Sequence, residues 1–227
     1  MSKAEGGLSV RDLSVERGGR TVIADLSFEI EPGQAVLLTG PNGAGKTTLI
    51  RTLAGLLSPI GGVIALQGAA VDDQLSEQCH YVAHTNAAKT DLTVRQNLRF
   101  WARFMRGVPG AEEAAISEVG LASLGDIPVR YLSAGQQRRV AIGRLLVAKR
   151  ALWLLDEPTV SLDAANTARL EKFGNAHLAA GGMIVAATHI PLDFKPMVEL
   201  KLSPVAFDAE VDDLWGELPP LQSGAEA

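Results

Sequence analysis

Apolar and polar residues alternate along two segments near the amino terminus, residues 8–15 and 26–30. A period of two is typical of strands with one buried and one exposed face, so this pattern predicts an antiparallel pair. Residues 35–39 form a continuous apolar run, as in strands buried on both faces. The amino-terminal part of the chain therefore predicts a small antiparallel sheet followed by a buried strand.

Short apolar segments and longer segments with helical periodicity alternate along the rest of the chain. Apolar side chains recur at helical spacing between residues 91 and 125, which predicts a separate helical lobe. They are Val94, Leu98, Trp101 and Met105. The other segments predict helices at 46–57, 135–149 and 164–179, the first ended by Ser58-Pro59, and strands at 151–155 and 183–187, the second after a Gly181-Gly182 turn. This order indicates an α/β fold with a parallel sheet flanked by helices.

The length of 227 residues, of which 47% are hydrophobic, suits one domain with a substantial core. We expect this domain to span residues 1–202, with the helical lobe at about 85–145. Beyond Lys201 the chain carries six acidic residues and no basic one. This composition predicts an acidic, loosely ordered tail over residues 203–227.

Several function classes are disfavoured by composition. No apolar run approaches the roughly 20 residues that a membrane-spanning helix needs. No apolar segment follows Lys3, as it would in a signal peptide, so we expect a cytoplasmic protein. The single cysteine, Cys79, forms no internal disulfide and no CxxC metal pair. The net charge of −5 argues against a nucleic-acid partner.

Residues 40–47 fit the GxxxxGK[ST] pattern of a phosphate-binding loop between a buried strand and a helix. Its glycines let backbone N–H groups turn toward a phosphate, and the helix start adds the positive end of its dipole. Lys46 is expected to bind the β- and γ-phosphates of ATP, and Thr47 to ligate Mg²⁺. The candidate nucleotide-binding residues here are Gly40, Pro41, Asn42, Gly43, Ala44, Gly45, Lys46, Thr47 and Thr48.

Two carboxylates follow the apolar strand predicted at 151–155. Asp156 would lie at the carboxyl edge of the sheet, where open α/β folds bind their ligands, and is the second candidate ligand of Mg²⁺. Glu157 leaves the strand and would reach the water that attacks the γ-phosphate, as a general base or a positioning group. The alternative for this pair is a solvated strand end, since Pro158 follows.

A third motif, Leu-Ser-Ala-Gly-Gln-Gln, spans residues 132–137, and its Ser133 stands 23 residues before Asp156. Locally it describes a serine-capped helix whose hydroxyl and backbone could bind a phosphate oxygen. Together with the phosphate-binding loop and the acidic pair, it closely resembles the signature sequence of ABC-type ATPases, over about residues 8–202. The resemblance implies a P-loop ATPase with a mixed sheet core, an antiparallel β subdomain and a helical lobe.

In this family two chains face head to tail, and ATP on one P-loop is contacted by the signature of the other chain. The resemblance implies that Ser133, Gly135 and Gln136 make this contact. Asp163 in Ser161-Leu162-Asp163 resembles the D-loop residue that lines the interface. His189 after the strand at 183–187 resembles the switch histidine that contacts the γ-phosphate.

Two positions depart from the family pattern. His84 stands where these ATPases usually have a glutamine that touches Mg²⁺ or the attacking water and senses the transmembrane partner. A neutral imidazole makes one such hydrogen bond, but its charge depends on pH. Arg17 stands where an aromatic residue normally stacks on adenine, and a guanidinium can stack on a base as well. The alternatives are an exposed loop histidine and a solvated arginine.

The run at 126–139, His84, and residues 188–192 together resemble the ATPase subunits of the bacterial cytochrome c maturation system, the haem exporter. This narrower resemblance implies a peripheral position at the cytoplasmic face of the inner membrane. It also implies integral membrane subunits as partners, and it implies that those partners handle the haem. In this chain no CxxCH motif or histidine pair indicates a haem ligand.

Three alternative functions compete with this assignment, and the sequence disfavours the first two. A DNA-repair ABC ATPase needs a long coiled-coil or zinc-bearing insertion, whereas only 86 residues separate Lys46 from Leu132, with no heptads and no cysteine cluster. A P-loop kinase of small molecules is disfavoured by the signature motif. An exporter ATPase for a drug, lipid or polysaccharide remains the alternative within the family.

Overall fold

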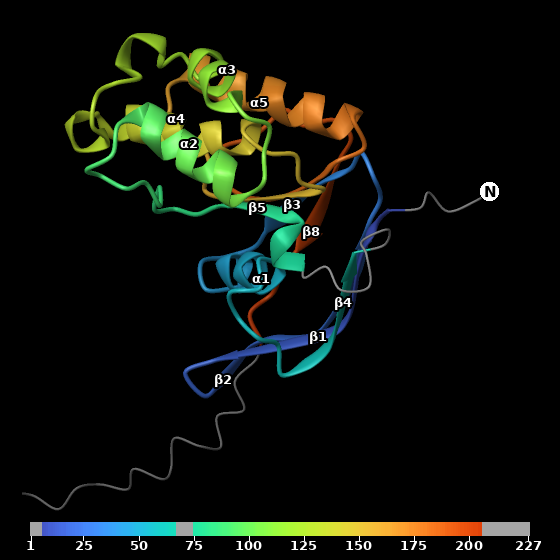
Figure 1. Ribbon diagram of the computed structural model, residues 1–227. Helices are drawn as coiled ribbons and strands as arrows, with labels where there is room; N and C mark the ends of the chain where they lie inside the picture. Colours follow the sequence, from blue (N-terminus) through green and yellow to red (C-terminus); the bar gives the residue numbers. More distant parts are fainter. Residues whose placement is uncertain (1–5, 67–74, 206–227) are drawn as a thin grey trace, which may run out of the picture.

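The computed structural model describes residues 6–66 and 75–205, which form two sheets and five α-helices (Figure 1). The strands of the antiparallel sheet, in the order β2-β1-β4, are β1 (Leu8–Arg17), β2 (Arg20–Ile30) and β4 (Gly61–Leu66). The parallel sheet has the order β5-β6-β7-β3-β8, with β3 (Ala35–Thr39), β5 (Cys79–Val82), β6 (Leu152–Asp156), β7 (Met183–Ala187) and β8 (Met197–Lys201). The expected α/β fold class is confirmed.

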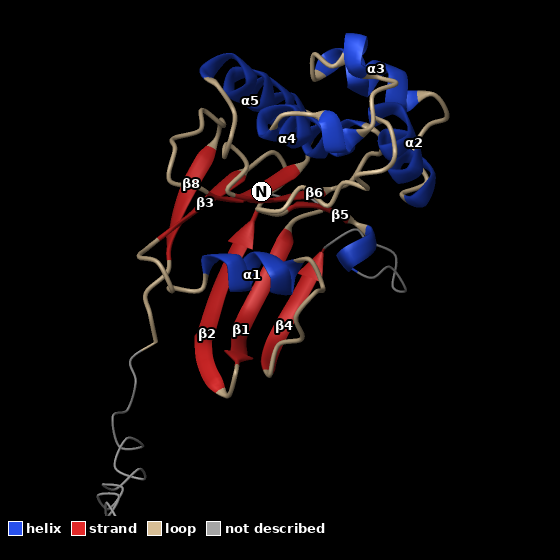
Figure 2. Cartoon of the chain, turned by 90° about the vertical axis from the view of Figure 1, so that its left-hand side faces the viewer, coloured by secondary structure: helices blue, strands red, loops and turns tan. Residues whose placement is uncertain are grey.

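The helices divide between the two faces of the parallel sheet (Figure 2). The first helix, α1 (Lys46–Leu53), lies between the parallel and the antiparallel sheet. The others lie on the opposite face: α2 (Val94–Phe104), α3 (Ala111–Glu118), α4 (Ala134–Gly143) and α5 (Ala164–Ala179).

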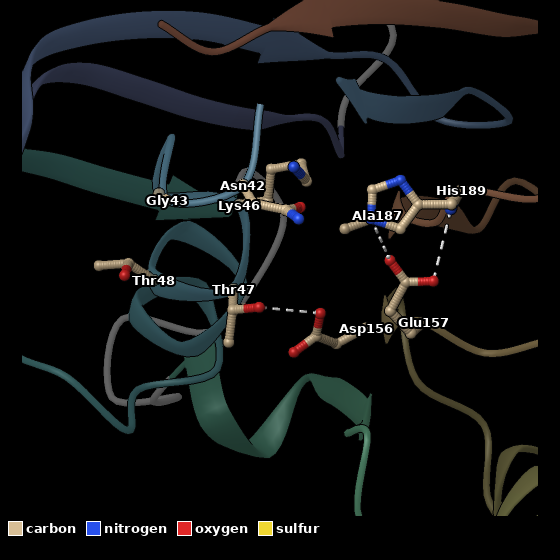
Figure 3. Close-up of a pocket in the computed structure, with 10 residues that line it drawn as sticks. Asn42, Gly43, Lys46, Thr47, Thr48, Asp156, Glu157, Ala187 and His189 are labelled. Carbon is tan, nitrogen blue, oxygen red and sulfur yellow. Dashed lines mark hydrogen bonds and ion pairs between the residues drawn. The ribbon is translucent and has the colours of Figure 1, made fainter. Parts of the chain in front are cut away.

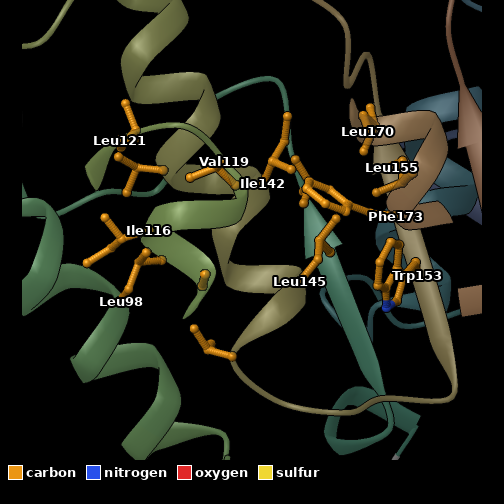
Figure 4. Packing of buried hydrophobic residues seen from close by; sticks show 14 of the residues in the cluster. Leu98, Ile116, Val119, Leu121, Ile142, Leu145, Trp153, Leu155, Leu170 and Phe173 are labelled. Atoms are coloured by element: carbon orange, nitrogen blue, oxygen red, sulfur yellow. The ribbon is translucent and has the colours of Figure 1, made fainter. Parts of the chain in front are cut away.

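The parallel strands other than the edge strand β8 are buried on both faces because their side chains alternate between two cores. In β6, Leu152 and Leu154 pack toward α1 and the antiparallel sheet, whereas Trp153 and Leu155 pack toward the helices of the other face. Figure 4 shows this second core, in which the strand residues meet apolar side chains of α2 to α5. The continuous apolar runs in the sequence are therefore strands with two buried faces.

The helix expected over 46–57 is shorter than predicted, since α1 ends at Leu53. Gly55 takes a positive φ of 71°, and the N–H of Leu56 donates to the carbonyl of Arg51. This is the left-handed turn that closes many helices, and it comes before Ser58-Pro59 can act as a stop.

The helix expected over 91–125 is interrupted. Thr93 caps α2 with a capping box, and the chain leaves the helix at Arg106, whose φ is +55°. The short helix α3 follows after Gly110. The helix expected over 135–149 continues only to Gly143 before a turn of 3-10 helix, and the strand expected at 151–155 begins at Leu152.

Strands β4 and β8 had no counterpart in the prediction. Both lie at sheet edges and are largely exposed: β8 mixes apolar residues with Glu199 and Lys201, and the short apolar run of β4 at 63–66 follows two glycines. Of the tail expected over 203–227, residues 206–227 lie outside the described residues. Within the described part of the chain, no helix is both long and apolar enough to cross a bilayer.

Candidate functional site

The carboxyl ends of three neighbouring parallel strands meet at one edge of the sheet. Strand β3 leads into the loop at 40–47, β6 ends in Asp156, and β7 runs on to His189. Such an edge is where open α/β sheets bind their ligands. A cavity of about 200 Å³ lies here (Figure 3). Its walls are Asn42, Gly43, Gly45, Lys46, Thr47, Thr48, Asp156, Glu157, Ala187 and His189.

The loop between β3 and α1 forms the wall that would receive phosphates. Gly40 has a φ of +131°, and a Cβ there would collide with the carbonyl oxygen of Leu202, so only glycine fits. Gly45 is the N-cap of α1 with a φ of +95° and no side-chain cap, which leaves the backbone donors of the first turn available. The Lys46 ammonium donates to the carbonyls of Gly40 at 2.7 Å and Pro41 at 3.0 Å, so it lies over the loop.

Asp156 faces the start of α1 because its position in β6 has the same parity as Leu152 and Leu154. The Thr47 hydroxyl donates to its Oδ1 at 3.1 Å (Figure 3). Burial raises the pKa of the Asp156 carboxyl, and the bond from Thr47 and the charge of Arg51 partly oppose this shift. A buried carboxylate beside a hydroxyl fits a cation that is also bound by phosphates.

The protein oxygens alone do not make a metal cage. Among the described residues no group of three His, Cys, Asp or Glu side chains could hold a metal ion. Mg²⁺ commonly binds through one or two protein ligands together with substrate phosphates. Thr47 and Asp156 are therefore the residues that fit this ion.

Glu157 turns sharply away from β6 toward His189. It has a φ of +49°, and its N–H donates to the carbonyl of Ala187 at 2.8 Å, which ties the turn to the neighbouring strand. Its carboxylate lies 3.4 Å from His189 Nε2 and accepts a bond of 3.4 Å from the His189 N–H (Figure 3). The structure thus brings the loop, Asp156, Glu157 and His189 together.

The signature residues lie outside this cavity. Ser133 is the exposed N-cap of α4: its Oγ accepts the N–H of Gln136 at 3.3 Å, and Gln136 Oε1 accepts the N–H of Ser133 at 2.8 Å. Gly135 packs against the turn before α5, since a Cβ there would approach the carbonyl oxygen of Ser161 to 2.7 Å. Within one chain these three residues form a capped helix start.

Three further candidates also lie outside the cavity lining. Asp163 caps α5 by accepting the N–H of Asn166 at 2.8 Å. Arg17 is exposed at the end of β1, next to the turn that leads to β2. His84 is exposed in a bend after β5. Burial is the main influence on the pKa of Asp156 and raises it, and a charge on His84 lies near enough to lower that pKa slightly.

One residue beside the site was missed by the sequence analysis. Arg138 is only 2% exposed, and its guanidinium donates to the backbone next to Asp156 and Glu157. Burial lowers its pKa to about 10, which leaves it charged near neutral pH. The available signal was periodicity, because Arg138 stands in line with the buried Ala141 and Ile142 on the inward face of α4 and with Leu145 in the turn that follows.

Comparisons with known proteins agree with this geometry. The model of the ABC transporter family matches residues 23–160. A Rhodopseudomonas palustris (strain BisB5) protein named cytochrome c biogenesis ATP-binding export protein CcmA is 50% identical over 185 residues, covering 82% of this chain and 92% of the relative. A protein of the same name from Agrobacterium fabrum is 46% identical over 202 residues, covering 86% and 95%.

Two solved structures share the fold. A putative ABC transporter ATP-binding protein from Pyrococcus furiosus superposes with a TM-score of 0.75 at 26% identity, over 86% of this chain and 97% of that one. A structure described as the ATP-binding subunit of an ABC transporter gives a TM-score of 0.76 at 27% identity, over 92% and 93%. The matches therefore extend over most of the chain.

Proposed function

Since the chain belongs to the ABC transporter family of ATP-binding subunits, we propose that it hydrolyses ATP within the cytochrome c biogenesis export complex. ATP binding and hydrolysis follow from the family, and the cytochrome c assignment is supported by about 50% identity to CcmA relatives over most of both chains. The observation that carries the chemical part is the cavity in which the P-loop, Asp156 and Glu157 meet.

The residues of this cavity suggest a division of labour. The backbone donors at the start of α1 and the Lys46 ammonium bind the phosphates of ATP. Thr47 and Asp156 hold Mg²⁺, which when bound offsets the negative charge of the phosphate oxygens. Asp156 must be ionised for this role, and the cation would favour that form against the effect of burial.

Glu157 acts on the attacking water. Its carboxylate is held beside the cavity by the His189 N–H, so it is oriented before substrate arrives. It takes the proton of the water or positions it in line with the γ-phosphate. His189, two-thirds exposed at the rim, steadies Glu157 and is the residue that we propose to contact the γ-phosphate.

A second copy of the chain completes the site. The cavity of about 200 Å³ is smaller than the 300–1,000 Å³ of most ligand pockets, and no signature residue lines it. In a head-to-tail pair, Ser133, Gly135 and Gln136 of the partner copy would cover the phosphates. Asp163 would lie at the interface, and Arg17 would lie near the adenine.

The remaining partners follow from the same assignment. ABC ATP-binding subunits work with membrane subunits, and we propose that this one binds the integral membrane subunits of the cytochrome c biogenesis complex at the cytoplasmic face of the inner membrane. Haem would be handled by those subunits. We also propose the division into an ATPase domain at 1–202, with a helical lobe at about 85–145, and an acidic tail.

The test is co-purification of the tagged chain from detergent-solubilised membranes, with the partners identified by mass spectrometry. We expect cytochrome c biogenesis membrane proteins in the complex, and release of phosphate from MgATP without any acceptor. Co-purification with the membrane subunits of a drug, lipid or polysaccharide exporter would refute the cytochrome c assignment. Hydrolysis that depends on an added phosphate acceptor would refute the ATPase assignment.

A further inference from the structure

We propose that Arg138 is a positioning residue that fixes the backbone around Glu157 and ties it to the loop that carries His84. The inference rests on the proposed ATPase function and adds a residue outside the three motifs. Arg138 lies one turn into α4, the helix that begins at the signature serine Ser133. Its guanidinium reaches from this helix to two other segments, and it contacts only backbone carbonyls and one amide oxygen there.

The first segment is the turn at the end of β6. Arg138 Nη2 donates to the carbonyl oxygens of Asp156 at 3.3 Å and Glu157 at 2.6 Å, and Nε donates to that of Pro158 at 2.9 Å. Three consecutive peptide groups are therefore oriented by one planar group. Glu157 needs such support, because its φ of +49° is a costly backbone conformation for a residue with a Cβ.

The second segment is the bend after β5. Arg138 Nη1 donates to the carbonyl oxygen of Ala83 at 2.6 Å and to Asn86 Oδ1 at 3.1 Å. These two acceptors flank His84, so the guanidinium holds the bend on both sides of that histidine. A displacement of the bend relative to α4 would strain the same group that holds the Glu157 turn.

The chemistry favours arginine at this position. Its five N–H donors lie in one rigid plane, which matches acceptors on two sides, whereas lysine offers a single ammonium. The carbonyl oxygens satisfy the buried donors, and the charges of Asp156 and Glu157 favour the cationic form of Arg138. The same guanidinium thus connects the signature helix, the candidate base and the His84 bend.

The experiment compares Arg138→Met and Arg138→Lys with the wild type in the membrane complex purified through the tagged chain. Arg138→Met keeps the unbranched apolar stem of the side chain but removes every donor. We expect kcat to fall by about 10²-fold, as for a reacting group misplaced by about 1 Å, while KM and ATP affinity stay within about threefold. Arg138→Lys should recover part of kcat, because it keeps the charge and some donors.

Arg139→Gln is the matched control. The neighbouring arginine donates to the carbonyl oxygens of Val119 and Gly120 in the lobe, and its bonds within the described part of the chain do not reach the Glu157 turn. Its substitution should leave kcat within about twofold, since the two lost bonds join α4 to the end of α3 and not to the Glu157 turn. A wild-type kcat in folded Arg138→Met complex would overturn the inference. Because wild-type turnover and its loss in Glu157→Gln are measured alongside, failure of the proposed ATPase function would be recognised separately.

Asn86→Ala covers the case in which Arg138→Met does not fold. It removes one bond between Arg138 and the bend and leaves both Arg138 and His84 in place. We expect partner-stimulated kcat to fall about three- to tenfold, as for one lost hydrogen bond, with unchanged ATP affinity. In a double-mutant cycle, adding His84→Ala should cost less than it does in the wild type. Unchanged stimulation in Asn86→Ala, or full additivity of the two substitutions, would overturn the link between Arg138 and the bend.

Discussion

The starts of α1 and α4 are both helix amino termini proposed to meet phosphates, yet they are built differently. Gly45 begins α1 in a left-handed conformation without a side-chain cap, so the first-turn donors face the cavity. At the start of α4, Ser133 and Gln136 satisfy each other's backbone N–H groups in a capping box. The first end is open to a ligand within one chain, and the second is a stable helix start by itself.

This difference supports our proposal that one chain contains half of the catalytic site. The α1 end lies at the sheet edge beside Asp156 and Glu157, the residues that we propose supply the chemistry. Ser133 at the α4 end is exposed and does not line that cavity, so its proposed contact with nucleotide would require another copy. In this proposal, ATP binding belongs to the α1 end, and ATP hydrolysis depends on both ends.

The largest expected effect comes from Glu157→Gln, which leaves the α1 end intact. We expect kcat to fall by about 10² to 10⁴ because the base or positioning group for water is lost, while ATP still binds. Phosphate release and ATP titration measure the two properties. Lys46→Ala is the matched variant and should lose binding as well. Wild-type turnover in Glu157→Gln complex would contradict the assignment of the base.

Two substitutions of the N-cap residue Ser133 test the α4 end. Asn and Asp are about equally good N-caps, so Ser133→Asn and Ser133→Asp should both keep α4 folded. Only the aspartate would repel a phosphate, and it should lower ATPase activity of the complex by about 10- to 100-fold relative to asparagine. ATP binding to the isolated chain should be equal in the two. Equal ATPase activity would mean that Ser133 meets no phosphate.

A smaller effect is expected at His84, which lies between the two regions. His84→Ala should leave nucleotide affinity within about threefold. It should lower the ATPase activity induced by the membrane partner by about three- to tenfold, as expected for one lost hydrogen bond. His84→Gln should restore much of it, since an amide makes the same bond. Identical stimulation in all three would assign His84 to an ordinary loop.

The smallest effect concerns stability at the α1 end. Burial raises the pKa of the Asp156 carboxyl, so its charge destabilises the folded chain at any pH above that pKa, and the effect disappears as the pH falls through it. Asp156→Asn should therefore raise Tm at neutral pH without nucleotide, by a few degrees at most, since about 1 kcal/mol corresponds to about 2–4 °C. It should also lose most of the stabilisation by MgATP. A lower Tm at neutral pH would show that the charge is compensated within the chain.

The sequence predicted the elements that carry the α1 end because each motif follows a strand buried on both faces. The apolar runs before Gly40 and Asp156 mark strand ends, and parallel strands bring those ends to one edge. The edge strands β4 and β8 were missed: β8 mixes apolar residues with Glu199 and Lys201, and the apolar run of β4 at 63–66 follows two glycines, which weaken a strand signal. The end of α1 was misplaced because Gly55 closes the helix before the proline.

The relations between segments were harder to predict. No local pattern indicates that Gly135 packs against Ser161, or that Arg138 spans three segments, because these contacts join residues that are distant in sequence. An arginine in the apolar stripe of α4 was the available signal. It indicates a buried, bonded guanidinium but not its partners.

The central proposal is that each chain contains half of the catalytic site. Its most direct test is cross-linking between two different chains, one with Asn42→Cys and the other with Ser133→Cys. Asn42 and Ser133 are exposed, and the native Cys79 is buried with a pKa raised to about 11, so its thiol reacts slowly. In a Glu157→Gln background, a short bis-maleimide should join the two chains in the presence of MgATP and not without nucleotide. Absence of the linked dimer with MgATP at high protein concentration, although both cysteines react with a simple maleimide, would contradict the account.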